Sequence, residues 1–297
     1  MIGRNIILSV ALSLCAFLGQ GQTKRALLIG ISEYTTHTKP SDDIWANIHG
    51  ANDVELLSQT LNKQDFKIKK LTNKAATAHQ IRKEFARFIT SCRPGDIVYL
   101  HFSCHGQPVE DLNGDEEDGW DEAIIPVDAQ KVYQKGKYTG ENHIIDDELN
   151  EYLRSIRTKV GDKGFVYVVI DACHAGFSYR GDEEGDGIIV RGTNRGFTMS
   201  KKLYAPPIND LSKRSKIIIE KSNSMADICI IEACRSYEMN REILENGRYY
   251  GSLSFYVNQS LQTTKLGKNK TWMEHIPKMM KQDMRLHGQN PVMETSL

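Results

Sequence analysis

Uninterrupted apolar runs alternate along the chain with segments whose apolar residues recur at helical spacing. A run that is rich in β-branched and aromatic residues and bounded by turn residues is typical of a strand buried on both faces. Such runs occupy residues 25–31, 96–102, 165–170 and 226–233, while residues 66–71 and 291–294 predict two further strands. Because helical segments separate these runs, we expect one mostly parallel sheet.

The helices between these strands are predicted by capping residues followed by apolar spacing. Asn52 or Asp53 begins the first helix, Thr77 caps the second and Asp146 caps the third. Two more helices follow from Ser252 and from Thr271. The expected fold class is therefore α/β, with a central sheet of about six strands covered by helices on both faces.

Two of the predicted strands end in residues that can perform chemistry. One ends before His105 and Gly106, and the other at Asp171, two residues before Cys173. Open α/β sheets place their sites at the carboxyl ends of such strands. Cys173 is a candidate nucleophile and His105 a candidate general base or acid, and the backbone N–H groups of Cys173 and Gly106 are candidates for binding an oxyanion. The alternative is two core strands that finish in ordinary turns.

The motifs around these residues resemble those of one family. SCHG after the first strand and DACHAG after the second are similar to the histidine and cysteine motifs of the caspase superfamily, peptidase family C14. GDEEDGWDEAIIPVDA is similar to metacaspases in particular, and EACRSYEMNRE resembles the start of that family's small subunit. Ala175 replaces the usual Ser, and Cys104 stands where Gly is common. The resemblance implies a caspase-like fold and a bacterial, metacaspase-like cysteine endopeptidase with a His105–Cys173 dyad.

The resemblance also implies a substrate preference, because metacaspases cleave after Arg or Lys. The acidic specificity pocket of the family corresponds here to Asp53, Ser103 and Asp171. A pair of carboxylates suits a guanidinium, which can donate two parallel hydrogen bonds. The alternatives are a helix N-cap for Asp53 and a turn-capping carboxylate for Asp171. The expected partners are peptides or proteins with basic residues.

Calcium is the one cofactor that the resemblance suggests, as an activator and not as part of the chemistry. The family's carboxylate ligands correspond to Asp121, Asp146 and Asp147, which are hard oxygen donors suited to this ion. A fourth ligand position holds Arg180, with Asp182 nearby as a substitute. An EF-hand interpretation of the acidic stretch is weaker than a solvated loop; its ligand positions would be Asp111, Asn113, Asp115 and Glu122.

The peptidase domain is expected to span residues 22–297 and to have two parts. A large-subunit-like part covers about 22–185 and a small-subunit-like part about 225–297, with an exposed flexible linker at about 178–224. If the pocket binds basic residues, the chain is a zymogen that can cut itself in this linker. The candidate positions are Arg191, Arg195, Lys202 and Arg214. The alternative is a solvated basic loop.

The first residues have the pattern of a signal peptide. Arg4 precedes an apolar run over residues 6–18, and small and polar residues follow, so residues 1–21 predict export to the periplasm or the exterior. Once the signal is cleaved, no stable membrane insertion is expected; an uncleaved anchor is the alternative. Five cysteines then remain at irregular spacings, which argues against a disulfide framework. The net charge of +0 argues against nucleic acid as a partner.

Two other functions remain open on the sequence alone. The first is a catalytically silent caspase-like module that binds partners, although both members of the dyad are present. The second is a caspase-clan protease of different specificity, such as one that cleaves after Asp. The pocket carboxylates oppose the second, because a like-charged substrate would leave them without a counter-charge. The oligomeric state is left open.

Overall fold

The computed structural model describes residues 22–34, 43–173, 189–205 and 219–297, and its core is a six-stranded sheet. The strand order is β11-β8-β7-β3-β1-β2, and all neighbours pair in parallel except β11 with β8. The bounds are β1 Lys24–Gly30, β2 Phe66–Thr72, β3 Ile97–Ser103, β7 Phe165–Asp171, β8 Asp227–Glu232 and β11 Val292–Thr295. Every residue of β3 and β7 is buried, as the apolar runs predicted.

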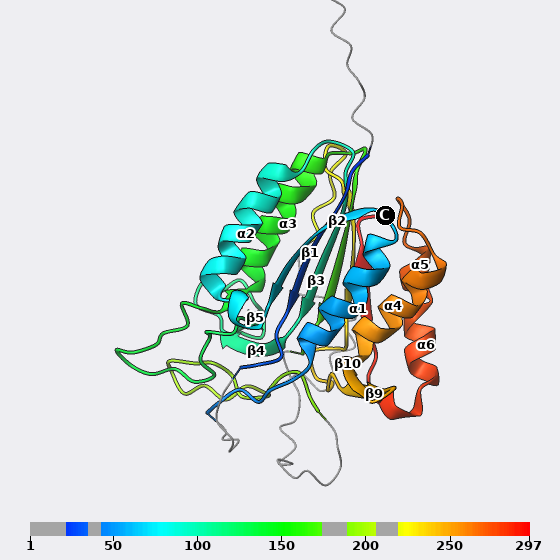
Figure 1. Cartoon of the computed structure of the whole chain (residues 1–297). Helices are drawn as coiled ribbons and strands as arrows, with labels where there is room; N and C mark the ends of the chain where they lie inside the picture. The colour runs from blue at the N-terminus through cyan, green and yellow to red at the C-terminus, as the bar shows by residue number, and fades with distance from the viewer. Residues whose placement is uncertain (1–21, 35–42, 174–188, 206–218) are drawn as a thin grey trace, which may run out of the picture.

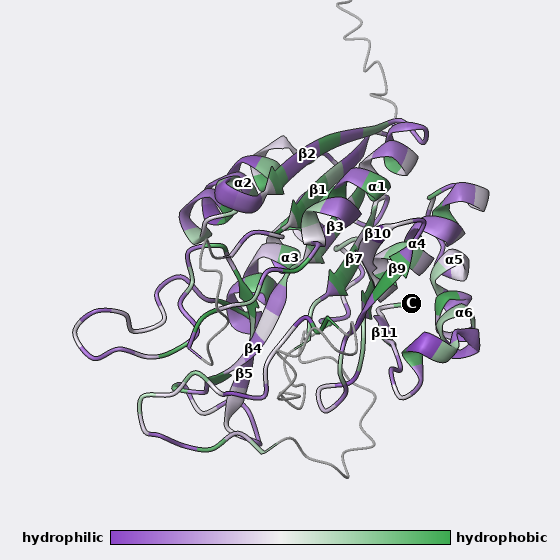
Figure 2. Cartoon of the chain, turned by 60° about the horizontal axis from the view of Figure 1, so that its bottom comes forward, coloured by the Kyte–Doolittle hydropathy of each residue, from purple (hydrophilic) through white to green (hydrophobic). Residues whose placement is uncertain are grey.

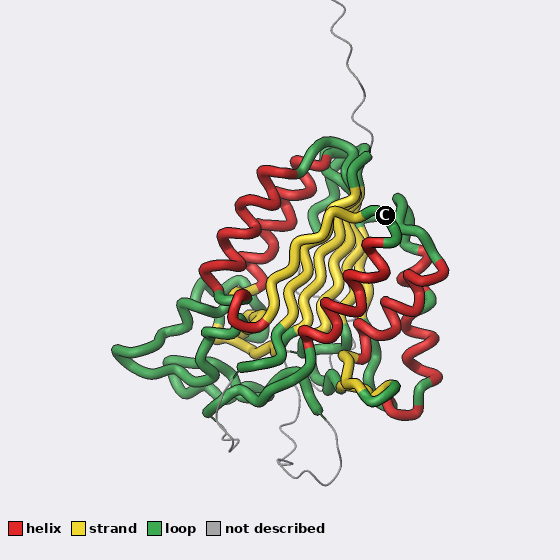
Figure 3. The backbone as a smooth tube through the Cα atoms, in the orientation of Figure 1, coloured by secondary structure: helices red, strands yellow, loops and turns green. Residues whose placement is uncertain are grey.

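Helices cover both faces of this sheet (Figures 1 and 3). The helices α2 (Ala78–Ser91) and α3 (Asp146–Val160) pack on one face. The other face carries α1 (Gly50–Asn62), α4 (Ser252–Thr263), α5 (Thr271–Glu274) and α6 (Ile276–Gln282). Single 3-10 turns lie at Asn73–Ala75 and Met284–Leu286. The expected architecture, an α/β fold with a sheet of about six strands and helices on both faces, is confirmed.

The helix starts agree with the sequence only in part. Thr77 caps α2, because its side chain accepts a hydrogen bond from the backbone of Gln80. The start predicted at Asn52 or Asp53 is wrong, and so is the alternative of Asp53 as a cap, since α1 begins at Gly50 and Asp53 lies inside its first turn. Asp146 is likewise the first helical residue of α3 and not its cap. Both carboxylates have other contacts, described below.

A second, antiparallel sheet lies at the carboxyl ends of the central strands (Figure 2). It consists of β4 (His105–Glu110), β5 (Trp120–Ile125) and β6 (Ile144–Ile145). The sequence indicated only an acidic loop here, because charged residues interrupt the apolar pattern of β5. A hairpin of β9 (Glu242–Glu245) and β10 (Arg248–Gly251) was also missed; it leads into α4. The sheet and the hairpin both lie next to the candidate site described below.

The linker was expected to be exposed, and this is wrong for Arg191, Thr193 and Phe197, which are buried, whereas residues 199–203 are exposed. The stretch from Arg191 to Phe197 lies against the domain, because these two residues are 0% and 3% exposed, while Leu203 further along is 89% exposed. Arg180, Asp182 and Arg214 of the predicted linker lie outside the described residues, as does the predicted signal peptide. Within the described ranges, no helix combines the length and apolarity needed to cross a membrane.

Candidate active site

The register of the central sheet brings the two predicted catalytic residues to one edge. The strands β3 and β7 pair in parallel, with Ser103 opposite Asp171. His105 and Cys173 each follow two residues later, so both leave the same end of adjacent strands. Their chain segments then diverge, because β3 continues into β4 while Cys173 pairs in a bridge with Gly192 of the linker.

His105 is held in one orientation by three contacts. Its Nε2 lies 2.9 Å from the carbonyl oxygen of Ala46, and its backbone N–H donates to the hydroxyl of Tyr34. The ring stacks on Trp45 with centroids 4.8 Å apart. Because a carbonyl only accepts, Nε2 carries the proton and Nδ1, which is buried without a hydrogen-bond partner, keeps its lone pair. Burial lowers the pKa of His105 to about 3, so the ring is a neutral base.

The thiol of Cys173 is buried beside His105's strand end but is turned to other partners. Its Sγ donates to the carbonyl oxygen of Glu238 at 2.8 Å, and the Sγ of Cys234 lies 3.4 Å away. Within the described ranges, His105 has no hydrogen bond to Cys173. The thiol proton therefore faces a carbonyl in this conformation, and a rotation of the Cys173 side chain is needed to bring it to an imidazole nitrogen.

The predicted specificity pocket holds a side chain of the protein itself, the guanidinium of Arg191. Its Nη1 lies 2.8 Å from Asp53 Oδ2, 2.6 Å from Ser103 Oγ and 3.6 Å from Asp171 Oδ1. The opposite edge of the guanidinium, Nε and Nη2, donates to Glu242 Oε1 at 3.0 and 2.8 Å. The three predicted pocket residues are thus together around one arginine, and Glu242 is a fourth that the sequence did not indicate.

Further hydrogen bonds fix the pocket carboxylates in place. The backbone N–H of Gly251 donates to Asp53, and the N–H and hydroxyl of Ser254 donate to Asp171 at 2.7 and 2.6 Å. Asn240 donates to the other oxygen of Asp171. These donors come from β10, α4 and the segment before β9, so the small-subunit-like part completes the pocket.

The electrostatics of the pocket favour a bound cation. Burial raises the pKa of Asp53 to about 7, although Arg191 acts in the opposite direction. Burial alone would lower the pKa of Arg191, but the carboxylates of Asp53, Asp171 and Glu242 raise it further above its usual value. His49 donates to Glu242 through both its backbone N–H and Nδ1. A pocket with this excess of carboxylates needs a positively charged occupant.

The backbone of Arg191 lies as an extended peptide between Cys173 and β9. The N–H of Arg191 donates to Asn240 O at 2.9 Å, and the N–H of Glu242 donates to Ile189 O at 2.9 Å. The N–H of Cys173 donates to the Arg191 carbonyl oxygen at 2.8 Å. This is one of the two donors predicted for the oxyanion.

The second predicted oxyanion donor, Gly106, lies in β4 opposite Ile124. It follows His105 directly, so it lies on the same strand end as the base.

The other basic residues predicted as processing positions lie outside the pocket. Arg195 makes an ion pair with Asp43 at 2.6 Å, where both side chains are exposed. Lys202 donates to the carbonyl oxygen of Gly119 and lies over the ring of Trp120. Arg214 is not among the described residues. Of the described candidates, Arg191 alone has its guanidinium bound by the pocket carboxylates.

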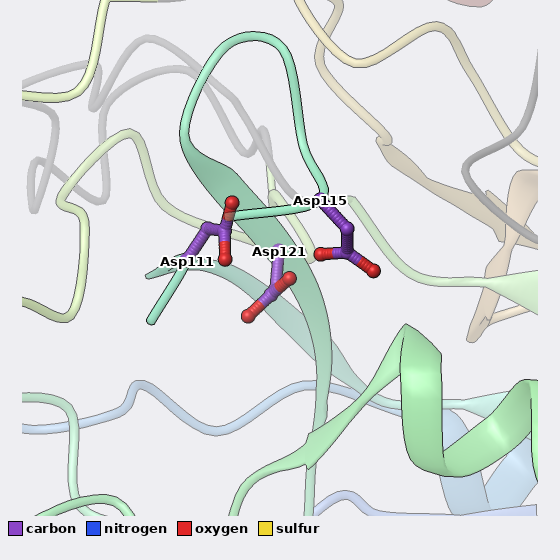
Figure 4. A group of neighbouring side chains, drawn as sticks. All are labelled: Asp111, Asp115 and Asp121. Carbon is purple, nitrogen blue, oxygen red and sulfur yellow. The ribbon is translucent and has the colours of Figure 1, made fainter. Parts of the chain in front are cut away.

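Of the predicted calcium ligands, Asp121 lies in β5 of the second sheet, whereas Asp146 and Asp147 begin α3. One oxygen from each of Asp111, Asp115 and Asp121 lies within 4.8 Å of the others, and Figure 4 shows the three side chains around a common space. Burial and neighbouring carboxylates raise the pKa of Asp121 to about 7, and burial and Glu122 raise that of Asp146 to about 8.

Asp146 and Asp147 have protein donors instead of a place in this group. The backbone N–H of Glu122 donates to Asp146 at 3.0 Å. The side chain of Asn113 donates to Asp147 at 2.8 Å. The chemistry of the whole donor set, carboxylate oxygens with little compensating charge, fits a hard divalent cation.

Several residues of the site were missed by sequence reasoning. Glu242 and Asn240 belong to the EACRSYEMNRE segment, which was noted only for its resemblance. Their position beside β7 depends on the pairing of β8, which no local pattern reveals. Trp45 and Tyr34, which hold His105, lie in a loop without periodicity. Both residues precede the first helix, and no local pattern marks them as contacts of His105.

The fold and site together define a class of protein: an α/β domain with a cysteine and a histidine at adjacent strand ends beside an acidic pocket. The sequence profile of the caspase domain matches residues 23–297. The chain therefore belongs to the caspase domain family of peptidases, as the motifs indicated. The caspase-like fold agrees with a crystal structure of a Geobacter sulfurreducens protein, which superposes with a TM-score of 0.60 at 21% identity and covers 92% of this chain and 93% of that one.

Curated relatives of the chain include metacaspases. Metacaspase-2 of Arabidopsis thaliana is 32% identical over 161 residues, which are 52% of this chain and 34% of that protein. Metacaspase-1B of Aspergillus fumigatus is 38% identical over 101 residues, 34% of this chain and 22% of that protein. Metacaspase-1 of Meyerozyma guilliermondii is 25% identical over 266 residues, 78% and 60% of the two chains. The chain thus spans less than two thirds of each of these relatives.

Proposed function

We propose that this protein is a cysteine-type endopeptidase that cleaves after arginine and is made as a zymogen whose first substrate is its own Arg191–Gly192 bond. The observation that carries the proposal is the position of Arg191. Its side chain lies among Asp53, Asp171 and Glu242 while its carbonyl oxygen accepts from the N–H of Cys173. A peptide bound in this way has its scissile carbonyl next to the nucleophile.

The proposed reaction begins when the Cys173 thiol leaves Glu238 and transfers its proton to Nδ1 of His105. The thiolate attacks the carbonyl carbon of the arginine, and the tetrahedral oxyanion is bound by the N–H of Cys173, with Gly106 as the second donor. His105 then gives the proton to the departing amine, which leaves a thioester on Cys173. Water, deprotonated by His105, hydrolyses the thioester and restores the thiol.

The pocket contacts favour arginine over lysine. A guanidinium donates from one edge to Asp53 and Ser103 and from the other to Glu242, which lies on the far side of the group. The single ammonium of lysine is a compact charge that cannot donate to both edges at once. Lysine substrates are therefore expected to be cleaved more slowly.

The test uses the full chain, purified with and without the change Cys173→Ala. Intact-mass and N-terminal analysis should find a new terminus at Gly192 in the native chain and none in the variant. Peptide substrates ending in Arg should then be cleaved faster than those ending in Lys, and those ending in Asp should not be cleaved. A folded chain that neither cuts itself nor turns over any of these substrates would identify a silent caspase-like module. Cleavage after Asp would identify a different specificity.

Calcium is proposed as an activator that binds the acidic loop. The support is the group of Asp111, Asp115 and Asp121, whose mutual repulsion would be relieved by a divalent cation. These residues would bind and order the loop, and the peptidase chemistry itself needs no metal. Self-cleavage in calcium and in chelator tests this; equal rates would contradict it.

Export is proposed from the charged, apolar and small-residue order of residues 1–21. A tagged chain should be recovered from the periplasm or medium with a mass that lacks this segment. Recovery from the cytoplasm at full mass would contradict it.

A further inference from the structure

The chain that follows the proposed scissile bond lies along the edge of β4. The N–H of Phe197 donates to Pro108 O at 2.8 Å, and the N–H of Glu110 donates to Phe197 O at 2.9 Å. One step earlier, the side chain of Gln107 donates to Arg195 O at 2.8 Å. A peptide bound on the leaving-group side of the bond therefore gains backbone contacts with a strand that begins at His105.

The Phe197 ring enters an aromatic pocket. Its centroid lies 4.5 Å from that of His143 and 5.7 and 6.2 Å from those of Tyr138 and Tyr133. Gly140, at φ +106°, leaves the ring its space, because a Cβ there would lie 2.9 Å from it. The ring contributes apolar burial and edge-to-face contacts, which stabilise an aromatic side chain specifically.

The walls of this pocket are built by contacts that do not include Phe197. The Tyr138 hydroxyl donates to Nδ1 of His143 at 3.0 Å, and Nε2 of His143 donates to the side-chain oxygen of Gln107 at 3.1 Å. Burial lowers the pKa of His143 to about 4, so this arrangement of donors is the neutral one. The pocket can therefore keep its shape when another peptide replaces the linker.

We propose that the edge of β4 and the pocket of Tyr138, Gly140 and His143 form a binding site for the leaving-group side of substrates, and that it takes an aromatic side chain six residues after the cleaved bond. The inference rests on the proposed function and names a second recognition element for the same reaction. The substrates are peptides with an arginine followed, at that distance, by a phenylalanine or a similar ring.

Such a site selects the cleaved bond by its distance along the chain from the aromatic residue. The five residues between Arg191 and Phe197 set the distance between the cleaved bond and the ring, and this fixes the arginine that reaches Cys173 when the ring is in place. Counting from Arg191, the sixth following residue is Phe197; from Arg195 it is Lys201, and from Lys202 it is Ile208. The required six-residue distance to an aromatic ring therefore selects Arg191 among the basic residues of the linker. The acidic pocket alone does not distinguish one arginine of the linker from another.

The first experiment follows self-cleavage of the full chain with Phe197 changed. The variant Phe197→Ala should cut the Arg191–Gly192 bond at least about tenfold more slowly, because burial of a ring of this size is lost. Its cuts should also spread to other basic residues. Phe197→Leu should keep part of the rate, and the control Leu203→Ala, which removes an 89% exposed apolar side chain from the same segment, should behave as the native chain. An unchanged rate and position in Phe197→Ala would overturn the inference.

The second experiment varies the substrate, so that folding of a variant is not in question. Two peptides covering residues 189–199 are compared, one native and one with alanine in place of Phe197. The processed Phe197→Ala enzyme, whose own segment no longer fills the pocket, should prefer the native peptide by about tenfold in kcat/KM. A short substrate that ends at arginine and has no residues after the cleaved bond is run alongside. If the enzyme cleaves the short substrate but shows no preference between the two peptides, the aromatic pocket is not a substrate site, and the proposed peptidase function still stands. If the enzyme cleaves none of the substrates, the proposed function itself is wrong.

Discussion

Glu242 binds the edge of the Arg191 guanidinium that Asp53 leaves free, so it should decide between arginine and lysine. The change Glu242→Gln keeps the size of the side chain and removes its charge. A hydrogen bond to a charged partner contributes about 1.5–3 kcal/mol, so KM for arginine peptides should rise roughly 10- to 100-fold. Because Glu242 touches neither Cys173 nor His105 in the described contacts, kcat should change little. Steady-state kinetics with matched Arg and Lys peptides measures both effects, and an unchanged Arg-to-Lys ratio would remove Glu242 from the pocket's selectivity.

Asp53 gives the pocket a pH dependence. Burial raises its pKa to about 7, so as the pH falls from 8 to 6 the carboxyl gains a proton and the pocket loses one negative charge. Arginine is then bound more weakly, and KM should rise toward low pH. His105 stays neutral over this range because burial holds its pKa near 3. The profile of KM against pH measures this; in Asp53→Asn, KM should be high throughout and independent of pH. A native profile that is flat over the same range contradicts the assignment.

Cys173 and Cys234 are close enough to form a disulfide under oxidising conditions. Their sulfur atoms lie 3.4 Å apart, and a disulfide needs about 2.05 Å, so a small movement suffices. Oxidised glutathione should take two electrons and two protons from the pair, yielding two molecules of reduced glutathione and an inactive enzyme. Dithiothreitol should restore the activity. Peptide mass mapping identifies the bond. The variant Cys234→Ala should not show this fast, reversible loss of activity. If oxidised glutathione inactivates the variant as fast as the native enzyme, the disulfide between Cys173 and Cys234 is not the cause.

At the scale of elements, negative charge is concentrated where the β4–β5 loop meets Asp121 of β5 and Asp146 at the start of α3. Asp121 and Asp146 have pKa values raised to about 7 and 8, so between pH 4 and 8 the folded chain holds protons that the unfolded chain has released. Stability from these groups is therefore present at low pH and lost as the pH rises through 7 and 8. We expect the melting temperature to fall by a few degrees from pH 5 to 8 and calcium to restore it at pH 8. Differential scanning calorimetry, with Asp121→Asn as the control, checks this. A melting temperature at pH 8 that does not change when calcium is added contradicts it.

The elements that the sequence could predict are those whose information is local. The strands β3 and β7 are continuous β-branched and aromatic runs, and α2 has both its cap at Thr77 and its apolar stripe. The second sheet escaped prediction because Asp121 and Glu122 interrupt the apolar pattern of β5, and pairing with β4 decides its structure. Polar residues inside a strand carry no local signal for burial.

The candidate site divides along the same line. Asp53, Ser103, Asp171, His105 and Cys173 follow from strand ends and motifs, and the structure gathers them at one edge. What could not be foreseen is that the pocket is filled from within. Arg191 looked like a solvated linker residue because its segment has no periodicity. Its burial depends on the carboxylates of Asp171, Glu242 and Asp53. These residues are 20, 51 and 138 positions away from Arg191 in the sequence.

At the scale of the whole molecule, Arg191 joins the two halves of the uncut chain. It neutralises Asp53 and Asp171 of the large-subunit-like part and Glu242 of the small-subunit-like part, all of them buried. Removing one partner of a buried ion pair costs about 3–5 kcal/mol, because the remaining charges have no solvent. In an inactive Cys173→Ala background, Arg191→Ala should therefore lower the melting temperature at pH 8 by roughly 10 °C.

Two changes of conditions should raise the melting temperature of this double variant again. At pH 6 Asp53 is protonated, so one uncompensated charge disappears. A small guanidinium compound at millimolar concentration should fill the vacant pocket and raise the melting temperature in proportion to the logarithm of its concentration. The matched control is Arg195→Ala, whose ion pair with Asp43 is exposed and contributes little. If Arg191→Ala melts like Arg195→Ala and does not respond to guanidinium, Arg191 does not hold the two parts of the chain together.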